Sequence, residues 1–177
     1  MANRAALREL HTRLAARLQN ARAQGQAMQW LAVEIGTGRF LVPLAQSGEI
    51  FPWTSVQNTP YTQDWFLGVS NLRGSLCGVA DMAAFMGLAV QTNALERDRS
   101  ECSLLTFNSS LELNCAILVD RLSGLRGPEA FTASQAVAVD SAKPYLGLQH
   151  TDTAGQQWQE LNLQTLSQFP PFLSISA

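Results

Sequence analysis

Charged residues are scarce in this chain of 177 residues: they make up 15% of it, against roughly a quarter in an average domain. Hydrophobic residues make up 46% and the net charge is -2. Such a composition excludes intrinsic disorder, which needs low hydrophobicity and high net charge. There is also no basic stripe of the kind with which a domain grips nucleic acid, so we expect no nucleic-acid partner.

Cysteine and histidine are almost absent, with three and two residues. Cys77, Cys102 and Cys115 form no C-x-x-C pair and are odd in number, which argues against a disulfide framework and against a zinc site. We interpret all three as buried thiols in a reducing compartment. His11 and His150 have no metal-ligand spacing, so we expect surface or capping roles for them and no metal site.

Motifs of catalysis and of membrane insertion are missing as well. There is no G-x-S-x-G elbow, and the glycine pair at 36–38 lacks the lysine and the following helix of a phosphate loop. We therefore expect no enzyme and no cofactor. No apolar run approaches the ~20 residues that span a bilayer, and the first residues lack the apolar core of a secretory signal. The expectation is a cytoplasmic protein with no direct membrane insertion.

The first residues form a basic amphipathic segment. Leucines recur every three or four residues from Leu7 to Leu18, which predicts a helix over 3–24. Residues 1–28 hold five arginines and one acid, Glu9. We interpret 1–28 as an N-terminal helix that packs on its own domain or on a partner. Binding to an anionic membrane surface and a partly ordered arm are the alternatives.

Beyond residue 28 the sequence predicts short strands joined by glycine-rich turns. Alternating hydrophobicity predicts strands, and Asp81 and Asn162 are expected to cap two short helices. This pattern favours all-β barrels over a parallel βαβ sheet. We expect one domain, 29–177, made of two sub-barrels at roughly 29–95 and 96–177 that can share strands, with the charged run 96–99 as a solvated linker. The expected strands are 29–36, 39–43, 48–53, 66–72, 75–80, 102–107, 111–119, 122–125, 144–148, 158–161 and a closing edge strand at 172–175.

One hairpin stands out from this pattern. Asn71, Leu72, Arg73 and Gly74 form the expected tip of a tight turn between two strands. Glycine can adopt a positive φ there, and an asparagine side chain can bond to turn backbone. From composition alone, Arg73 is either a solvated turn residue or a group that contacts a partner.

This segment resembles the conserved motif of the CheW-like family of chemosensory coupling proteins. The matching positions are Gly68, Val69, Asn71, Leu72, Arg73, Gly74, Val79 and Asp81, with Met82 in place of the family's leucine. Weaker similarities follow in the family's order at 39–43, 48–50, 58–60, 117–122, 145–147 and 161–163, so the resemblance covers roughly 29–168. The departures are Ser75 for lysine, Gly78 for proline and Asn162 for aspartate.

The resemblance implies a mostly β fold: a CheW-like pair of small five-stranded SH3-like β-barrels, with the N-terminal α-helix and short additional helices. It also implies a non-enzymatic adaptor without cofactor or metal, whose partners are the cytoplasmic tip of a chemoreceptor and the regulatory domain of a CheA-type histidine kinase. Such a protein is recruited to membrane-associated receptor arrays. Carried over by position, the receptor-facing residues are Glu49, Ile50, Asn71, Leu72, Arg73 and Gly74. An alternative role for Glu49 is to hold Arg73 in place.

The long N-terminal helix and the final Pro-Phe-Leu-Ser-Ile stretch are more similar to the PilI-like subgroup, which serves type IV pilus systems. The expected function is thus to couple a methyl-accepting chemoreceptor to a CheA-type kinase that controls twitching motility. A flagellar chemotaxis coupling protein is the alternative within the family. A small-molecule-binding β-barrel is the alternative of a different class, and it would bind a metabolite without any protein partner.

Overall fold

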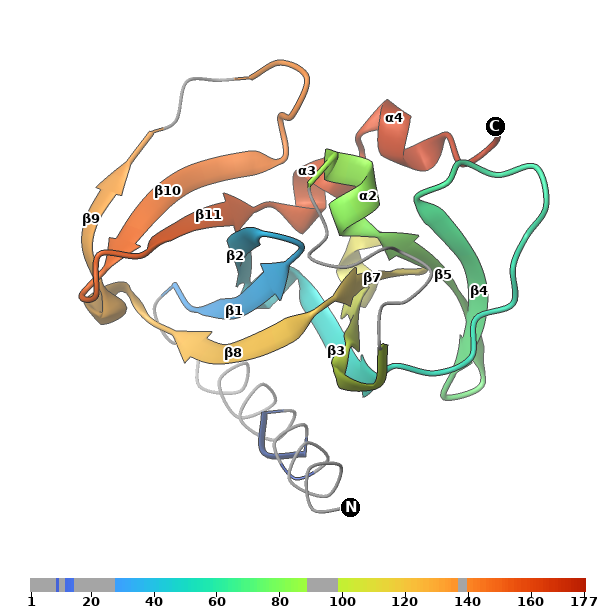
Figure 1. The fold of residues 1–177 in the computed structure, drawn as a ribbon, viewed down its shortest axis with the longest axis horizontal. Coiled ribbons are helices and arrows are strands. Elements are labelled where there is room, and N and C mark those ends of the chain that lie inside the picture. The colour runs from blue at the N-terminus through green and yellow to red at the C-terminus, as the bar shows by residue number, and fades with distance from the viewer. Residues whose placement is uncertain (1–8, 10–11, 15–27, 89–98, 137–139) are drawn as a thin grey trace.

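The computed structural model describes residues 9, 12–14, 28–88, 99–136 and 140–177. In this part of the chain, eleven strands and a few short helices form the fold (Figure 1). The strands are β1 (Trp30–Ile35), β2 (Gly38–Pro43), β3 (Ser47–Pro52), β4 (Phe66–Leu72), β5 (Ser75–Asp81), β6 (Ser103–Phe107), β7 (Cys115–Val119), β8 (Arg121–Arg126), β9 (Phe131–Gln135), β10 (Leu146–Asp152) and β11 (Gln157–Leu161). The helices are α2 (Met82–Met86), α3 (Leu163–Ser167) and α4 (Pro170–Leu173), with 3₁₀ turns η1 (Leu44–Gln46), η2 (Arg99–Glu101), η3 (Ser109–Leu111) and η4 (Pro128–Ala130).

The strands form two sheets. Sheet A has the order β8-β1-β2-β11-β10-β9, and sheet B has the order β3-β6-β7-β5-β4. β8 and β9 follow each other in the chain but lie at opposite edges of sheet A, so the chain itself joins those edges through η4. The expected fold class is confirmed: the fold is mostly β and consistent with a pair of SH3-like barrels.

The two sheets share strands across residue 95, which the sequence-based prediction allowed without naming the strands. Sheet A takes β1 and β2 from the start of the domain and β8 to β11 from its end, while sheet B is formed by the strands between them. Each sheet thus takes two strands from the other side of residue 95. The physical reason is the parallel pairing of β2 with β11, in which Phe40 lies opposite Gln159. Periodicity reports which residues form a strand but not which distant strand they pair with.

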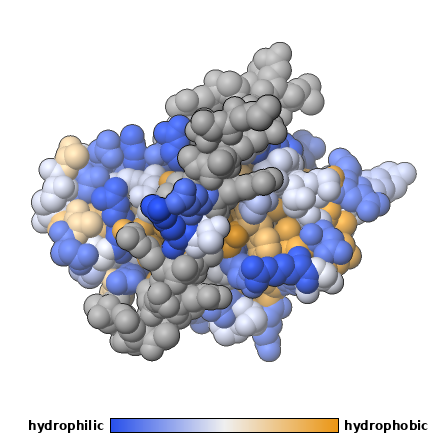
Figure 2. Space-filling view, turned by 90° about the horizontal axis from the view of Figure 1, so that it is seen from below, coloured by the Kyte–Doolittle hydropathy of each residue, from blue (hydrophilic) through white to orange (hydrophobic). Residues whose placement is uncertain are grey.

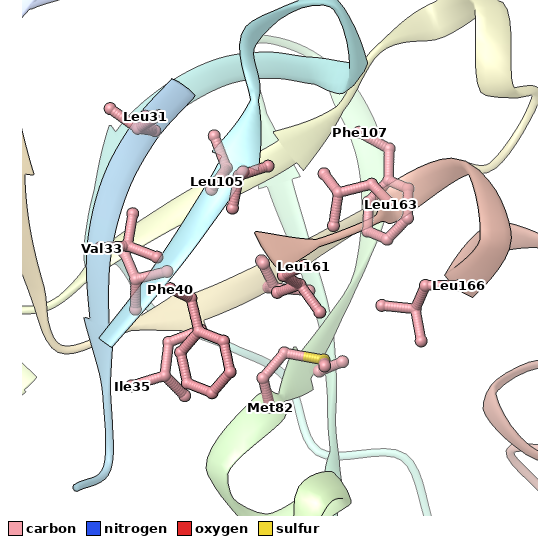
Figure 3. Close-up of a cluster of buried hydrophobic side chains, with 14 of the residues drawn as sticks. Leu31, Val33, Ile35, Phe40, Met82, Leu105, Phe107, Leu161, Leu163 and Leu166 are labelled. Atoms are coloured by element: carbon pink, nitrogen blue, oxygen red, sulfur yellow. The ribbon is translucent and has the colours of Figure 1, made fainter. Parts of the chain in front are cut away.

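Strands β1 and β7 are buried on both faces and connect the cores of the two sheets. Successive side chains of a strand point to opposite faces, so Val33 of β1 enters the central core while Ala32 enters the core of sheet A. In β7, Ile117 enters the central core and Leu118 the core of sheet B. Figure 3 shows the central core, where side chains of both sheets and of the short helices meet.

Sheet B is closed by the segment that follows β3. The Trp53 amide donates to the Cys102 carbonyl at 3.0 Å, which extends the pairing with β6. Further on, the amides and carbonyls of Gln57 and Val69 exchange hydrogen bonds of 2.8 and 2.9 Å. Because Val69 lies on β4, the chain that leaves one edge of the sheet pairs with the other edge.

The two expected short helices are confirmed with their caps. The Asp81 carboxylate accepts from the amides of Ala83 and Ala84 at the start of α2, and the Asn162 side chain accepts from the Thr165 amide at the start of α3. Of the expected N-terminal helix, 1–28, residues 9 and 12–14 are helical and Leu14 is 5% exposed. The rest of that helix, up to residue 27, lies outside the described residues.

Two elements differ from the sequence-based expectation. The expected edge strand at 172–175 is wrong for its first two residues, which belong to α4; this helix starts with Pro170 and Pro171, residues that favour a first helical turn. Beyond α4, the Ile175 carbonyl accepts from the Gln63 amide at 2.9 Å, and Ser176 forms an isolated antiparallel bridge with Thr62. Phe172 of α4 stacks on Trp65 with ring centroids 5.4 Å apart. Strand β9 was not among the expected strands, because its mostly exposed and polar residues carry no alternating hydrophobic pattern.

The three cysteines are free and buried, as predicted. Burial raises the pKa of the Cys77 thiol to about 11. Burial raises the pKa of Cys115 as well, and the neighbouring Cys77 adds to this effect. A raised pKa keeps a thiol protonated at neutral pH, so Cys77 and Cys115 are poor nucleophiles in the folded protein.

The carboxylate of Asp152 supports the turn between β10 and β11. It is 6% exposed and accepts from Trp158 Nε1 at 3.0 Å and from the amides of Ala154 and Gln156 at 2.9 Å. These hydrogen bonds, that of Trp158 first, hold the pKa of Asp152 below its ordinary value of 3.8. The folded protein therefore favours the ionised carboxylate.

This lowered pKa predicts a pH dependence of stability. The stabilising contribution of Asp152 is present above its ordinary pKa of 3.8 and is lost as the pH falls through the lower pKa of the folded state. We expect Asp152→Asn to flatten the dependence of the unfolding free energy on pH below about 4, as measured by urea unfolding at several pH values. Asp64→Asn, at an exposed carboxylate, is the control that keeps the wild-type slope. An unchanged slope in Asp152→Asn would contradict the assignment.

Candidate functional site

The hairpin between β4 and β5 ends in a two-residue turn. Leu72 pairs with Ser75, and the residues between them, Arg73 and Gly74, have φ values of 51° and 85°. Two positive φ values in succession fit the type I′ turn that joins strands most tightly. The Gly74 amide donates to Asn71 Oδ1 at 2.8 Å, so the asparagine stabilises the turn as the sequence suggested.

Arg73 does not simply extend into solvent from this turn. Its Nη1 lies 2.7 Å from Oε2 of Glu49 on β3, and its guanidinium lies 5.7 Å from the ring centroid of Phe51. The two side chains of the ion pair remain 72% and 50% exposed. Arg73 is therefore fixed by a charged and an aromatic neighbour, while its side chain stays open to a partner.

Arg73 and Glu49 line a surface hollow of about 450 Å³, here called the Arg73 hollow. Seen from below, hydrophobic residues gather on the half of the molecule that carries β3, β4 and β5, with hydrophilic residues beside them (Figure 2). The lining combines apolar, polar and charged groups from β3, the hairpin, β6 and the segment before β7. Its residues are Glu49, Phe51, Leu72, Arg73, Ser75, Cys77, Thr106, Phe107, Ser109, Glu112, Leu113 and Asn114.

The structure separates the six expected receptor-facing residues into two groups. Glu49, Asn71, Arg73 and Gly74 are exposed at or beside the hairpin tip, and Leu72 lies beneath them, buried in the core of sheet B but lining the hollow. Ile50 is different, since it is 9% exposed and packs in the central core. Alternation along β3 points Ile50 away from the face of Glu49, so the expectation that Ile50 contacts a partner is corrected.

Sequence reasoning missed one wall of the hollow, the segment from Ser109 to Asn114. Residues 108–110 were expected to form a hairpin turn and 111–114 to belong to a strand from 111 to 119, but β7 begins at Cys115. Glu112 has a φ of 53°, which ends η3 and turns the chain. Asn114 Nδ2 then donates to the Leu76 carbonyl. The asparagine and the two serines at 108–110 correctly indicated a turn, but no signal in the sequence gave its extension to Glu112 or its position beside Arg73.

A second hollow of about 480 Å³ lies at the far end of β3 and includes Trp53, Tyr61, Asp64 and Arg99 among its lining. Arg99 was expected to belong to a solvated charged run. In the structure its guanidinium lies 4.8 Å from the ring centroid of Trp53, so this arginine packs on the domain. Residues 96–98 of that run lie outside the described residues.

His150 was expected to have a surface or capping role, and this is wrong. It belongs to β10, is 4% exposed, and contacts Ser134 Oγ at 2.7 Å and Glu160 Oε1 at 3.2 Å. Trp30 Nε1 also donates to Glu160 Oε1, at 3.0 Å. Neither of the two hollows includes these four side chains. Each buried polar group among them has a partner, so we assign the cluster to the packing of sheet A. His11 lies outside the described residues.

Comparison with known proteins identifies the fold that carries this site. Residues 29–168 match the CheW-like domain. The chain belongs to the CheW-like family. It is 24% identical to the protein PilI of Pseudomonas aeruginosa over 167 residues, a match that covers 93% of this chain and 89% of that protein.

Two further matches agree with the CheW-like assignment. The probable chemotaxis protein CheW of Rhizobium etli is 36% identical over 58 residues, which is 33% of this chain and 37% of that protein. The scaffolding protein TtCheW of Thermoanaerobacter tengcongensis superposes with a TM-score of 0.60 at 14% identity, over 77% of this chain and 89% of that one. The structural match supports the fold, and the family match places the hairpin motif of Arg73 inside a CheW-like domain.

The described residues contain no group of three or more side chains that could together hold a metal ion. Among the helices that the structure describes, none has the length and apolar character needed to cross a bilayer. Within the described part of the chain, the Arg73 hollow is thus the place where residues of the family motif line a surface cavity.

Proposed function

We propose that this CheW-like protein is a non-enzymatic adaptor that couples a methyl-accepting chemoreceptor to a CheA-type histidine kinase. It acts in the cytoplasm at membrane-associated receptor arrays, and the Arg73 hollow receives the cytoplasmic tip of the receptor. The observation that carries the proposal is the position of Arg73. This residue of the family motif is held at the rim of a hollow whose other lining groups include the apolar side chains of Phe51, Leu72 and Leu113.

The physical logic of coupling follows from linkage. An adaptor that binds receptor and kinase at once changes the affinity of each for the other by the same factor. The receptor state then biases the kinase state without any covalent chemistry on the adaptor. A charged residue fixed beside apolar groups suits this role, since the apolar contact supplies affinity and the charge selects the partner.

We further propose that the output is twitching motility by type IV pili. The similarity to PilI spans most of both chains, whereas the similarity to the probable chemotaxis protein CheW is confined to a third of this chain. Deletion of the gene is expected to abolish twitching and to leave flagellar swimming unchanged. Loss of swimming with normal twitching would instead support the flagellar alternative.

The coupling itself is tested with three purified components: this chain, the kinase, and membranes that carry the receptor encoded in the same genome. We expect the chain to bring the kinase down with the receptor membranes and to make kinase autophosphorylation respond to the receptor's stimulus or methylation state. Membranes without receptor are the control. If the kinase responds equally without the chain, or if the chain binds neither component, the coupling role is refuted and the small-molecule-binding barrel becomes the working alternative.

A further inference from the structure

Three non-glycine residues of the described chain have a positive φ: Tyr61, Arg73 and Glu112. This conformation is unfavourable for residues with a Cβ, and glycine or asparagine adopts it more readily. Arg73 and Glu112, which carry opposite charges, both line the Arg73 hollow. Backbone strain of this kind tends to persist where a side chain is needed for function. The positive φ of Glu112 therefore points to a role for its side chain in addition to the turn that its backbone forms.

The backbone around Glu112 is firmly held. Its amide donates to the Ser109 carbonyl at 3.1 Å, which closes η3. Two residues later, Asn114 accepts from the Gly78 amide at 3.1 Å and donates to the Leu76 carbonyl. Asn114 is thus bonded to β5 through its backbone carbonyl and through its side-chain amide. The exposed Glu112 side chain therefore extends from a backbone segment whose position is fixed.

The charges that line the hollow do not balance. They are Glu49, Arg73 and Glu112. Glu49 and Arg73 neutralise each other across 2.7 Å, which leaves the negative charge of Glu112. The ion pairs found among the described residues do not include Glu112. The uncompensated charge of the hollow is therefore negative, and it favours a cation on whatever segment binds there.

The apolar part of the lining indicates the rest of the binding segment. Leu113 follows Glu112 directly and packs on the central core, while Phe51 and Leu72 belong to the opposite, sheet-B core. A hollow of about 450 Å³ has room for large side chains. An apolar side chain placed here would lie within reach of both Arg73 and Glu112, which line the same space.

We propose that Glu112 is a specificity residue of the Arg73 hollow, and that it selects a receptor segment that carries a lysine or arginine beside an apolar side chain. This rests on the proposed function and adds the chemistry of the partner. Glu112 pairs with the receptor's cation, and the strained backbone keeps the carboxylate at the rim of the hollow. The apolar neighbour of that cation packs against Leu72 and Leu113.

The test removes the charge without changing the turn. Glu112→Asn keeps a residue that tolerates positive φ and should fold like the wild type, as checked by its thermal unfolding midpoint. We expect its affinity for the purified cytoplasmic fragment of the receptor, measured by titration calorimetry, to fall by about tenfold at low salt, with a weaker dependence on salt. Glu129→Gln, at an exposed glutamate of η4 outside the hollow, is the matched control and should bind like the wild type.

The outcomes separate this proposal from the proposed function. Wild-type binding by Glu112→Asn, together with lost binding by Arg73→Ala, overturns the role of Glu112 and leaves the coupling role intact. Wild-type binding by both variants counts against the hollow itself as the receptor site. Weaker binding to the kinase fragment alone also overturns the proposal, because it assigns the hollow to another occupant. If Glu112→Asn does not fold, Glu112→Gly gives the same comparison, since glycine relieves the positive φ.

A reversal of charge gives independent support. Glu112→Lys is expected to weaken receptor binding more than Glu112→Asn does, because it adds repulsion to the lost attraction. Replacing one lysine or arginine of the receptor tip by glutamate should then restore binding to the Glu112→Lys variant and not to the wild type. If no such replacement on the receptor restores binding, Glu112 does not pair with a receptor cation.

Discussion

Gly68→Ala is expected to destabilise the domain by at least about 4 kcal/mol, a loss in the range of the most damaging single substitutions. Gly68 of β4 has a φ of +127°, which side-chain-bearing residues rarely adopt. A Cβ at this position would lie 2.0 Å from the Gln57 carbonyl oxygen and 2.7 Å from its carbon. These atoms belong to backbone that pairs with Val69 and closes sheet B, so the clash can be relieved only by opening that closure.

The measurement is urea unfolding followed by tryptophan fluorescence, with Gly155→Ala as the control. Gly155 also has a positive φ, +79°, but nothing lies within 4 Å of its would-be Cβ. The control variant bears only the conformational penalty, about 1–2 kcal/mol. Equal losses in the two variants would contradict the role assigned to the close approach of Gln57, since then the φ value alone would account for the effect.

The local elements of this fold were predictable because their signals are local. Alternating hydrophobicity placed β1, β2, β4 and β5 within a residue or two, and Asp81 and Asn162 marked the helix starts that the structure confirms. The division of the strands was not predictable in this way. It depends on the parallel pair of β2 and β11, which are separated by the whole of sheet B and leave no trace in either strand's own pattern.

The same distinction applies to the candidate site. The hairpin tip at Arg73 was found because the motif is contiguous, and the alternative that Glu49 holds Arg73 agrees with their ion pair. Ile50 was misplaced because resemblance carried the residue over without its orientation on β3. Glu112 was missed because its position beside Arg73 arises from a turn and from hydrogen bonds to β5, none of which has a motif in the sequence.

Arg73→Ala is expected to lower the affinity for the receptor's cytoplasmic fragment by about 30-fold or more, the loss typical of a central arginine at an interface. It should leave the free energy of unfolding nearly unchanged. An ion pair whose side chains are 72% and 50% exposed contributes about 0–1 kcal/mol to stability, because solvent screens it. Arg121→Ala, at an exposed arginine of β8, is the control for lost positive charge. A folded Arg73→Ala variant that binds like Arg121→Ala would remove Arg73 from the interface.

Glu49→Gln then decides what the ion pair does for binding. In the structure the Glu49 carboxylate fixes the Arg73 guanidinium beside Phe51. Because the Arg73 side chain is already ordered, it loses less conformational entropy when a partner binds it. We therefore expect Glu49→Gln to weaken receptor binding by a smaller factor, about three- to tenfold, and to have no effect when added to Arg73→Ala, because the two residues act as one unit. Tighter binding by Glu49→Gln would mean that Glu49 competes with a receptor carboxylate for Arg73. Additive losses would mean that Glu49 contacts the receptor on its own.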